Sequence, residues 1–210
     1  GRLVGPIRVS GLRVTAGGYR VAVAEAELDW RPLGLLGGKV VVDYLRAEGI
    51  AVTRLPAATG DAAGAAKAPP VLPEAWAPPL GLHLRQLDLR RLTFRPAPAR
   101  EPVVVDRLSG RLGVGGDGIH VRELRLAGPL MSARGEADLD PSGAYPLQAR
   151  LDWRLTLPER PPLSGNTRLA GSVRGTLELS HDMAPPIPLR LRARIERPLA
   201  EPSWELRAAV

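Results

Sequence analysis

Alternation between apolar and polar residues is the feature that most constrains how this chain can fold. It is clearest over residues 147–157, where every second residue is apolar and the residues between them are Gln, Arg, Asp, Arg and Thr. Successive side chains of a β-strand point to opposite faces, so this pattern predicts a strand with one apolar and one polar face. Residues 169–179 and 189–195 follow the same pattern. Such segments must assemble into sheet with one aliphatic face.

Other segments with strand character bring the expected total to about ten to twelve strands. They cover residues 7–15, 19–30, 39–46, 50–55, 80–94, 103–114, 119–126 and 131–139. The links between them are short and carry turn residues, as in Ala16-Gly17-Gly18 and Gly128-Pro129. Because short links join antiparallel neighbours, the sequence predicts a meander.

Two segments depart from the strand pattern. Pro32 suits the first position of a short helix near residues 32–36, and Gly37-Gly38 suits its end. Residues 56–79 are rich in Ala, Gly and Pro and have little to bury, so we interpret them as a mobile loop. The expected organisation is therefore an N-terminal β portion (1–55), this loop (56–79) and continuing β repeats (80–210).

The aliphatic faces of a dozen strands must be covered, and three folds can cover them: a sandwich, a barrel, or an open trough whose inside holds a ligand. Sandwich cores generally use bulky rings, but only 4% of the residues are aromatic against 44% hydrophobic. This favours the trough. The predicted fold is all-β: an elongated, twisted antiparallel meander forming an open hydrophobic groove, a β-taco. The alternation slips by one residue between Leu84 and Leu87 and between Val121 and Leu124, which predicts a β-bulge or a short strand break at each place.

Charge and metal-ligand content exclude several function classes. The net charge is +7, but no basic block is longer than Arg90-Arg91 and no zinc-finger or RNA-binding motif occurs, so we expect no nucleic-acid partner. Cysteine is absent, which excludes a disulfide scaffold and a cysteine metal site. His83, His120 and His181 lie far apart in the sequence, so we expect no metal site and interpret them as solvated or rim residues.

Motifs that resemble catalytic or cofactor sites have simpler interpretations. Residues 113–118 have the spacing of a dinucleotide-binding loop, but a strand pattern follows where a helix is required, which favours a hairpin turn. Ser180-His181-Asp182 contains triad residue types, yet sequence neighbours cannot align as nucleophile, base and orienter. The stripe of Arg190, Arg192 and Arg194 is interpreted as the wet face of a strand rather than a headgroup site. We expect neither catalytic residues nor a cofactor.

Several phrases near the N-terminus carry a family resemblance. They are, in order, a glycine-proline strand at residues 5–12, Leu28-Asp29-Trp30-Arg31-Pro32, the turn Leu35-Leu36-Gly37-Gly38, and the strand 42–52 with Glu48-Gly49-Ile50. A proline-rich break at 69–73 and a restart at 80–89 follow. In this order they resemble the TamB family, the inner-membrane component of the translocation and assembly module, grouped with AsmA-like and bridge-like lipid transfer proteins. The resemblance covers residues 1–95 closely and beyond them only the repeating strand pattern.

The resemblance implies a periplasmic protein of a Gram-negative envelope, tethered to the inner membrane and partnered by the outer-membrane barrel protein TamA. It also implies a long hydrophobic β-groove with a role in phospholipid transport and outer-membrane assembly. No apolar run of this chain approaches the roughly 18 to 20 residues that a membrane span needs. We therefore expect the family's anchor, and its C-terminal partner-binding domain, to lie outside these residues.

The expected function is a passive, non-enzymatic conduit in which phospholipid acyl chains lie on the aliphatic face. The residues expected to contact lipid are Leu82, Leu84, Leu87, Leu89, Leu151, Leu155, Leu177, Leu179, Leu191 and Ile195. The alternative is a structural or chaperone-like β-scaffold that assists outer-membrane protein assembly by accepting a strand at its edge.

Overall fold

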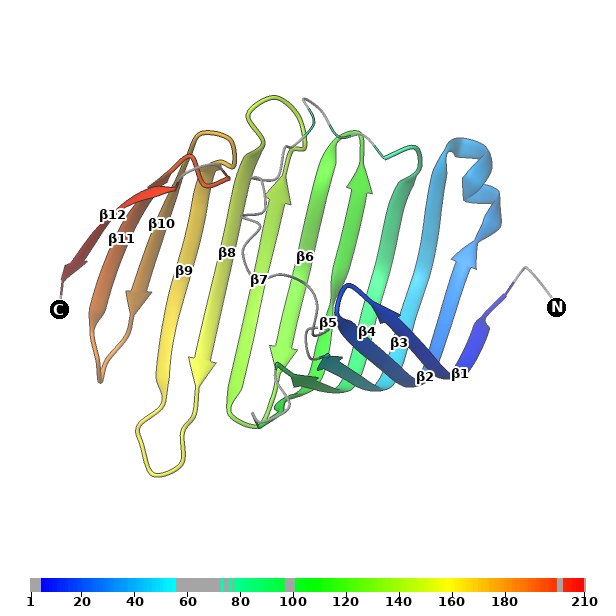
Figure 1. Cartoon of the computed structure of the whole chain (residues 1–210), viewed down its shortest axis with the longest axis horizontal. Coiled ribbons are helices and arrows are strands. Elements are labelled where there is room, and N and C mark those ends of the chain that lie inside the picture. The colour runs from blue at the N-terminus through cyan, green and yellow to red at the C-terminus, as the bar shows by residue number, and fades with distance from the viewer. Residues whose placement is uncertain are drawn as a thin grey trace, which may run out of the picture.

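The computed structural model describes residues 5–55, 73, 76, 78–96, 101–199 and 202–209. Within them the chain forms one sheet of twelve strands and one short helix (Figure 1). The elements are β1 (Ile7–Ala16), β2 (Tyr19–Arg31), η1 (Pro32–Gly37), β3 (Lys39–Arg54), β4 (Gly81–Arg95), β5 (Val103–Gly115), β6 (Gly118–Ala127), β7 (Met131–Leu139), β8 (Pro146–Leu155), β9 (Leu163–Ser172), β10 (Thr176–Met183), β11 (Leu189–Glu196) and β12 (Ser203–Ala209).

The strands follow one another across the sheet in chain order, from β1 at one edge to β12 at the other. The predicted meander is confirmed for every neighbouring pair except β3 and β4, which are parallel. The connection from Leu55 to Leu80 explains this exception, because a parallel pair needs a long crossover to return the chain to the same end of the sheet. The predicted loop at 56–79 lies almost wholly outside the described residues.

Most predicted strands are confirmed, with three differences. The predicted strands 39–46 and 50–55 merge into one continuous strand, β3, which ends at Arg54. Residues 169–179 are not one strand but the end of β9, a turn and the start of β10, and Gly175 N donates to Ser172 O across that turn. Strand β12 was missed. The predicted helix is the 3₁₀-helix η1, which Gly38 ends in the left-handed conformation at φ 68°.

Two lines of irregular pairing cross the sheet and bend it. The first lies where the alternation slips: pairing shifts between Leu84 and Leu87 and between Val121 and Leu124, and neither strand is broken there. The second line, here called the crease, is a set of adjacent unpaired positions on β1 to β5: Gly11, Ala24, Gly49, Arg91 and Asp106. Gly11, Gly49 and Arg91 have positive φ angles of 66°, 67° and 52°. Bulges bend strands, so both lines curve the sheet.

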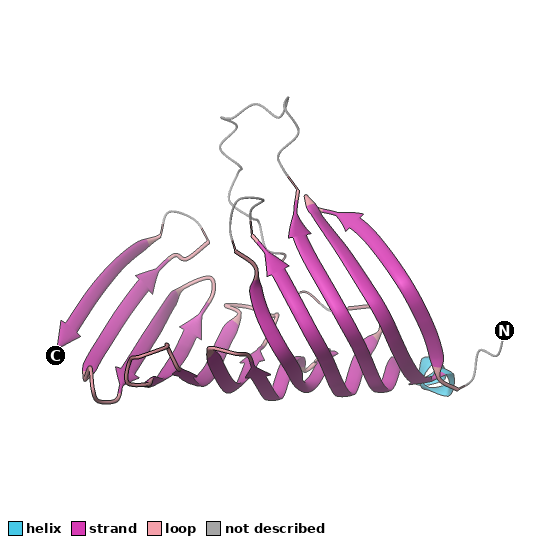
Figure 2. Cartoon of the chain, turned by 90° about the horizontal axis from the view of Figure 1, so that it is seen from below, coloured by secondary structure: helices cyan, strands magenta, loops and turns pink. Residues whose placement is uncertain are grey.

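Beyond the crease, the ends of β1 to β5 form a flap, here residues 12–23, 50–54, 92–95 and 103–105. In Figure 1 the flap stands forward of the other strands, and Figure 2 shows the resulting curved, open trough from below. The sheet does not close, since β1 and β12 are its two edges. In the described part of the chain, no second layer of strands or helices packs on either face.

The aliphatic side chains line the inside of this bend. In Figure 1 strand β7 runs upward with β6 on its right, and the Met131 carbonyl accepts a hydrogen bond from Gly128 N on that side. In a strand that runs upward, an L-residue whose carbonyl points to the right has its side chain directed toward the viewer. The flap projects in the same direction, so the aliphatic side chains lie on the inside of the bend. Val42, Ile50 and Leu84, beside the two lines of bulges, are buried although no second layer of strands or helices covers them within the described residues.

Candidate functional site

Four rows of directly opposed side chains cross the sheet and make up what is here called the aliphatic face. Row 1 consists of Val40, Leu82, Val114, Ile119, Leu139, Leu147, Gly171, Leu177, Ile195 and Trp204. Row 2 consists of Trp30, Val42, Leu84, Leu112, Val121, Ala137, Ala149, Leu169, Leu179, Ala193 and Leu206. Both rows are apolar from end to end.

The other two rows lie nearer the crease. Row 3 consists of Ile7, Leu28, Leu45, Leu87, Gly110, Leu124 beside it across a bulge, Gly135, Leu151, Thr167, His181, Leu191 and Ala208. Row 4 consists of Val9, Ala26, Ala47, Leu89, Leu108, Leu126, Ala133, Trp153, Gly165, Met183 and Leu189. Beyond the crease, the flap adds Leu12, Val23, Ile50, Leu92 and Val105.

All ten residues that the sequence singled out for lipid contact lie on this one side of the sheet. Rows 1 to 4 hold nine of them, and Leu155 continues beyond row 4 between Met131 and Leu163. That they share a face follows from the strand register. That they contact lipid stays a prediction.

Choosing residues by their alternating pattern in the sequence missed many members of the aliphatic face. Trp153 and the flap residues belong to it, and so do Val42 and Leu112 of row 2. In the flap the signal is hidden because the crease shifts the alternation by one residue: Val9 and Leu12 are both apolar-face residues although three positions separate them. A search for apolar residues that resume after a glycine would have found these positions.

Much of the aliphatic face is open to solvent. Leu151 is 37% exposed and Val9, Leu12 and Val14 on the edge strand β1 are also exposed. Leu177, in contrast, is only 8% exposed. A broad aliphatic surface of this kind has no shaped pocket, and it suits a ligand made of flexible hydrocarbon.

The opposite side, here called the outer face, carries ion pairs between neighbouring strands. Arg8 pairs with Glu27, Arg107 with Asp88, and Arg122 with Asp138. Hydrogen bonds from Arg122 and then His120 hold the pKa of Asp138 below its ordinary value. A hydrogen bond from Arg31 likewise lowers the pKa of Asp43, which Arg85 also contacts. The two faces therefore differ sharply in polarity.

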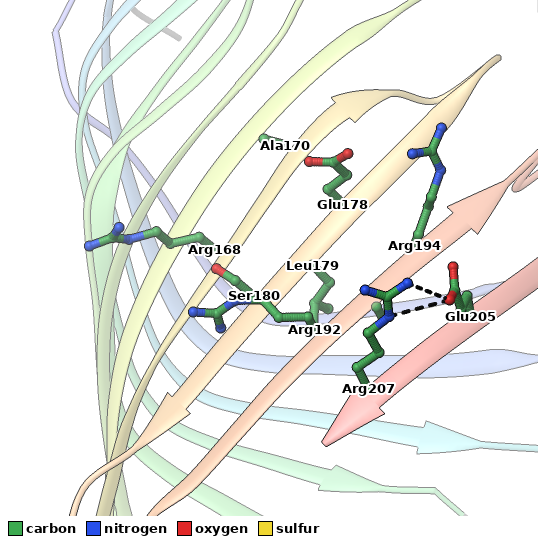
Figure 3. A pocket seen from close by; sticks show the side chains of 10 residues that line it. Arg168, Ala170, Glu178, Leu179, Ser180, Arg192, Arg194, Glu205 and Arg207 are labelled. Atoms are coloured by element: carbon green, nitrogen blue, oxygen red, sulfur yellow. Dashed lines mark hydrogen bonds and ion pairs between the residues drawn. The ribbon is translucent and has the colours of Figure 1, made fainter. Parts of the chain in front are cut away.

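Figure 3 shows a hollow on the outer face of β9 to β12. It has a volume of about 510 Å³, and Arg168, Arg192 and Arg194 stand around it with two glutamates. The Arg207 guanidinium donates to Glu205 Oε1 at 2.8 Å along one side. Such a charged lining favours water and ions over hydrocarbon, so this hollow is not a place for acyl chains.

The structure also resolves the motifs that resembled other sites. Residues 113–118 form the hairpin turn between β5 and β6, as predicted. His181 lies on the aliphatic face while Ser180 and Asp182 lie on the outer face, so the three side chains diverge. The described residues contain no cluster of three metal-ligating side chains.

The three histidines have different surroundings. His83 is exposed on the outer face, as expected of a solvated residue. His120 is half-buried, with its Nδ1 2.6 Å from Asp138 Oδ1. His181 differs from the expected solvated or rim position, because it lies half-buried on the aliphatic face between rows 2 and 4.

The helix η1 is too short to cross a membrane, and no other helix occurs in the described part of the chain. Comparisons with protein-family models, with curated proteins and with solved structures found no match to this chain.

Proposed function

We propose that this chain is a passive conduit for phospholipid, which binds acyl chains on the aliphatic face and leaves headgroups in water. The observation that carries the proposal is the continuity of rows 1 and 2, which cross ten and eleven strands without a polar side chain. A protein core would need a second layer over such a surface, and the described residues supply none.

The energetics favour a continuous surface. Two acyl chains of about 16 carbons moved into water would cost on the order of 25 kcal/mol, at about 0.8 kcal/mol per methylene. A lipid that stays on an aliphatic surface while it moves avoids this barrier. Strands lie about 4.8 Å apart, so ten strands provide roughly 45 Å of track, room for several lipids but a fraction of the way between two membranes.

The resemblance to the TamB family supports a setting for this activity. In that setting the protein acts in the periplasm, tethered to the inner membrane, and carries phospholipid between the inner and outer membranes together with TamA. This setting belongs to the proposal, as does the absence of catalysis.

Photo-crosslinking from adjacent residues of β8 tests the proposal. We expect a photoreactive group at Leu151 or Leu155 to capture phospholipid, because these side chains lie on the aliphatic face. Groups at Arg150 and Arg154 are matched controls on the same strand and the opposite face, and should capture none. Mass spectrometry of the adducts gives the answer. Equal capture from both faces would contradict the proposal.

A scaffold for strand addition is the second candidate, and the sheet edges favour it. Every residue of β12 is exposed, and its outer edge has no neighbouring strand among the described residues. An extended segment of another protein could pair there. Organic extraction of the purified protein separates the candidates: a conduit retains phospholipid, whereas a scaffold retains none and binds an extended peptide at β12.

A further inference from the structure

One pair of polar side chains interrupts the aliphatic face. Thr167 on β9 and His181 on β10 are directly opposed in row 3. Every other position in the four rows is aliphatic, glycine, methionine or tryptophan. The two polar residues are therefore neighbours rather than scattered, and rows 2 and 4 continue as hydrocarbon on either side of them through Leu169, Leu179 and Met183.

The pair is held in a defined geometry. Thr167 Oγ1 lies 2.8 Å from His181 Nδ1, a hydrogen-bond distance. The Trp153 indole stacks on the imidazole, with ring centroids 5.7 Å apart and planes 3° from parallel. Gly165 makes room for the indole, because a Cβ there would lie 3.0 Å from two indole carbons. The ring of His181 is thus fixed at both its face and its Nδ1 edge.

The second ring nitrogen of His181, Nε2, takes no part in these contacts. Within the described residues, Nε2 makes no hydrogen bond or ion pair, since Thr167 takes Nδ1. In the tautomer in which Nδ1 accepts a hydrogen bond from the Thr167 hydroxyl, Nε2 carries the ring's proton and is a hydrogen-bond donor. A valine and a leucine would fit these positions without any polar group to satisfy. The polar pair therefore adds a donor to the track rather than stability.

We propose that Thr167, His181 and Trp153 form a binding site for an acceptor oxygen of the lipid, with His181 Nε2 as the donor. Phospholipids offer two such oxygens, the ester carbonyl and the phosphate, at the polar end of their acyl chains. The apolar rows beside the pair bind those chains. The inference rests on the proposed function. It adds one position at which a hydrogen bond holds the polar end of a lipid, on a surface that is otherwise uniformly apolar.

The test compares three probes that share long hydrocarbon chains. Dimyristoylphosphatidylcholine has ester and phosphate, methyl palmitate has an ester alone, and hexadecane has neither. Each is incubated with the purified protein over a range of concentrations, and bound probe is quantified by mass spectrometry of an organic extract. The variants are Thr167→Val/His181→Leu and His181→Phe, the latter keeping a ring to stack on Trp153. Asn166→Val/Asp182→Leu is the matched control, an opposed pair on the outer face of the same strands.

We expect both aliphatic-face variants to bind phosphatidylcholine about five- to tenfold more weakly, the loss of one hydrogen bond, while hexadecane binding stays unchanged. The control should bind all probes normally. Weaker binding of methyl palmitate would identify the ester as the acceptor, and unchanged binding would identify the phosphate. If the double variant does not fold, His181→Phe decides. The site is refuted if the aliphatic-face variants bind phosphatidylcholine as tightly as the parent. It is also refuted if these variants lose hexadecane binding to the same degree, or if the control variant loses phosphatidylcholine binding to the same degree. A parent that binds no probe refutes the conduit as well.

Discussion

Asp88 is the buried charged residue of the described chain, at 4% exposure, although it lies on the outer face. Its carboxylate accepts hydrogen bonds from Arg107 Nε at 2.8 Å and from Arg90 Nη2 at 3.0 Å. Burial alone raises the pKa of Asp88, but the hydrogen bonds and the positive charges of Arg90 and Arg107 together outweigh it and hold the pKa below its ordinary value of 3.8. The two long arginine side chains cover the carboxylate that they neutralise.

This residue should make stability depend on pH. The folded-state pKa is depressed, so the stabilisation is fully present above the unfolded pKa near 4 and is lost as pH falls through the folded value. We expect Asp88→Asn to lower the free energy of unfolding at pH 7 by about 1–3 kcal/mol. The variant should also lose less stability than the parent on acidification below pH 4.

Urea denaturation at several pH values measures both effects. Asp106→Asn is the control, since Asp106 is exposed and forms no ion pair within the described residues. An Asp88→Asn protein with the parent's stability at pH 7 would show that the two arginines contribute nothing through this carboxylate.

At the scale of the element, the crease is what turns a flat meander into a trough. Positive φ angles at Gly11, Gly49 and Arg91 interrupt three of the five strands that form the crease. Gly49 is the most constrained of them, because a Cβ there would lie 2.8 Å from the Cβ of Ala24 on β2. Glycine at this position therefore allows two strands to approach where the sheet bends.

We expect Gly49→Ala to lower the free energy of unfolding by about 1–3 kcal/mol, because it combines a left-handed backbone with a close contact. Chemical denaturation followed by circular dichroism measures the change. Gly113→Ala on β5 is the matched control, since its Cβ would meet His120 at an ordinary 3.8 Å. If both variants lose the same stability, the crease does not depend on the conformation of Gly49.

At the scale of the whole molecule, the open trough and a closed core respond differently to a new charge. Leu191 is a half-buried member of row 3, opposite His181 and next to the edge strand. In a closed core an aspartate at this position would be buried without a partner, at a cost of several kcal/mol. On an open face it reaches water, and it disturbs only the ligand that lies there.

We therefore expect Leu191→Asp to keep its β circular-dichroism spectrum and to retain less phospholipid after extraction. Leu177→Asp should destabilise the fold more, because Leu177 is 8% exposed. Arg190→Asp, the adjacent outer-face position, should change neither lipid retention nor the spectrum. Unfolding of Leu191→Asp would mean that row 3 is the interior of a core, and normal lipid retention would remove this row from the track.

The sequence by itself determined most of the strands, the two faces of those strands up to the crease, and the register shifts at Leu84–Leu87 and Val121–Leu124, but it missed β12. These features are local: alternation and its slips are properties of neighbouring residues, and turn residues mark where a strand ends. It failed at residues 173–175, where a turn continues the alternation of the strands on either side and so leaves no break in the pattern.

Only the tertiary structure decided how the strands align. The parallel pairing of β3 with β4, the alignment of Gly11, Gly49 and Arg91 into one crease, and the meeting of Trp153 with His181 all join residues far apart in the sequence. Such contacts depend on register, and a shift of one residue in any pair would place every side chain of a strand on the other face. Pairing across the whole sheet selects that register, so a single segment does not contain it.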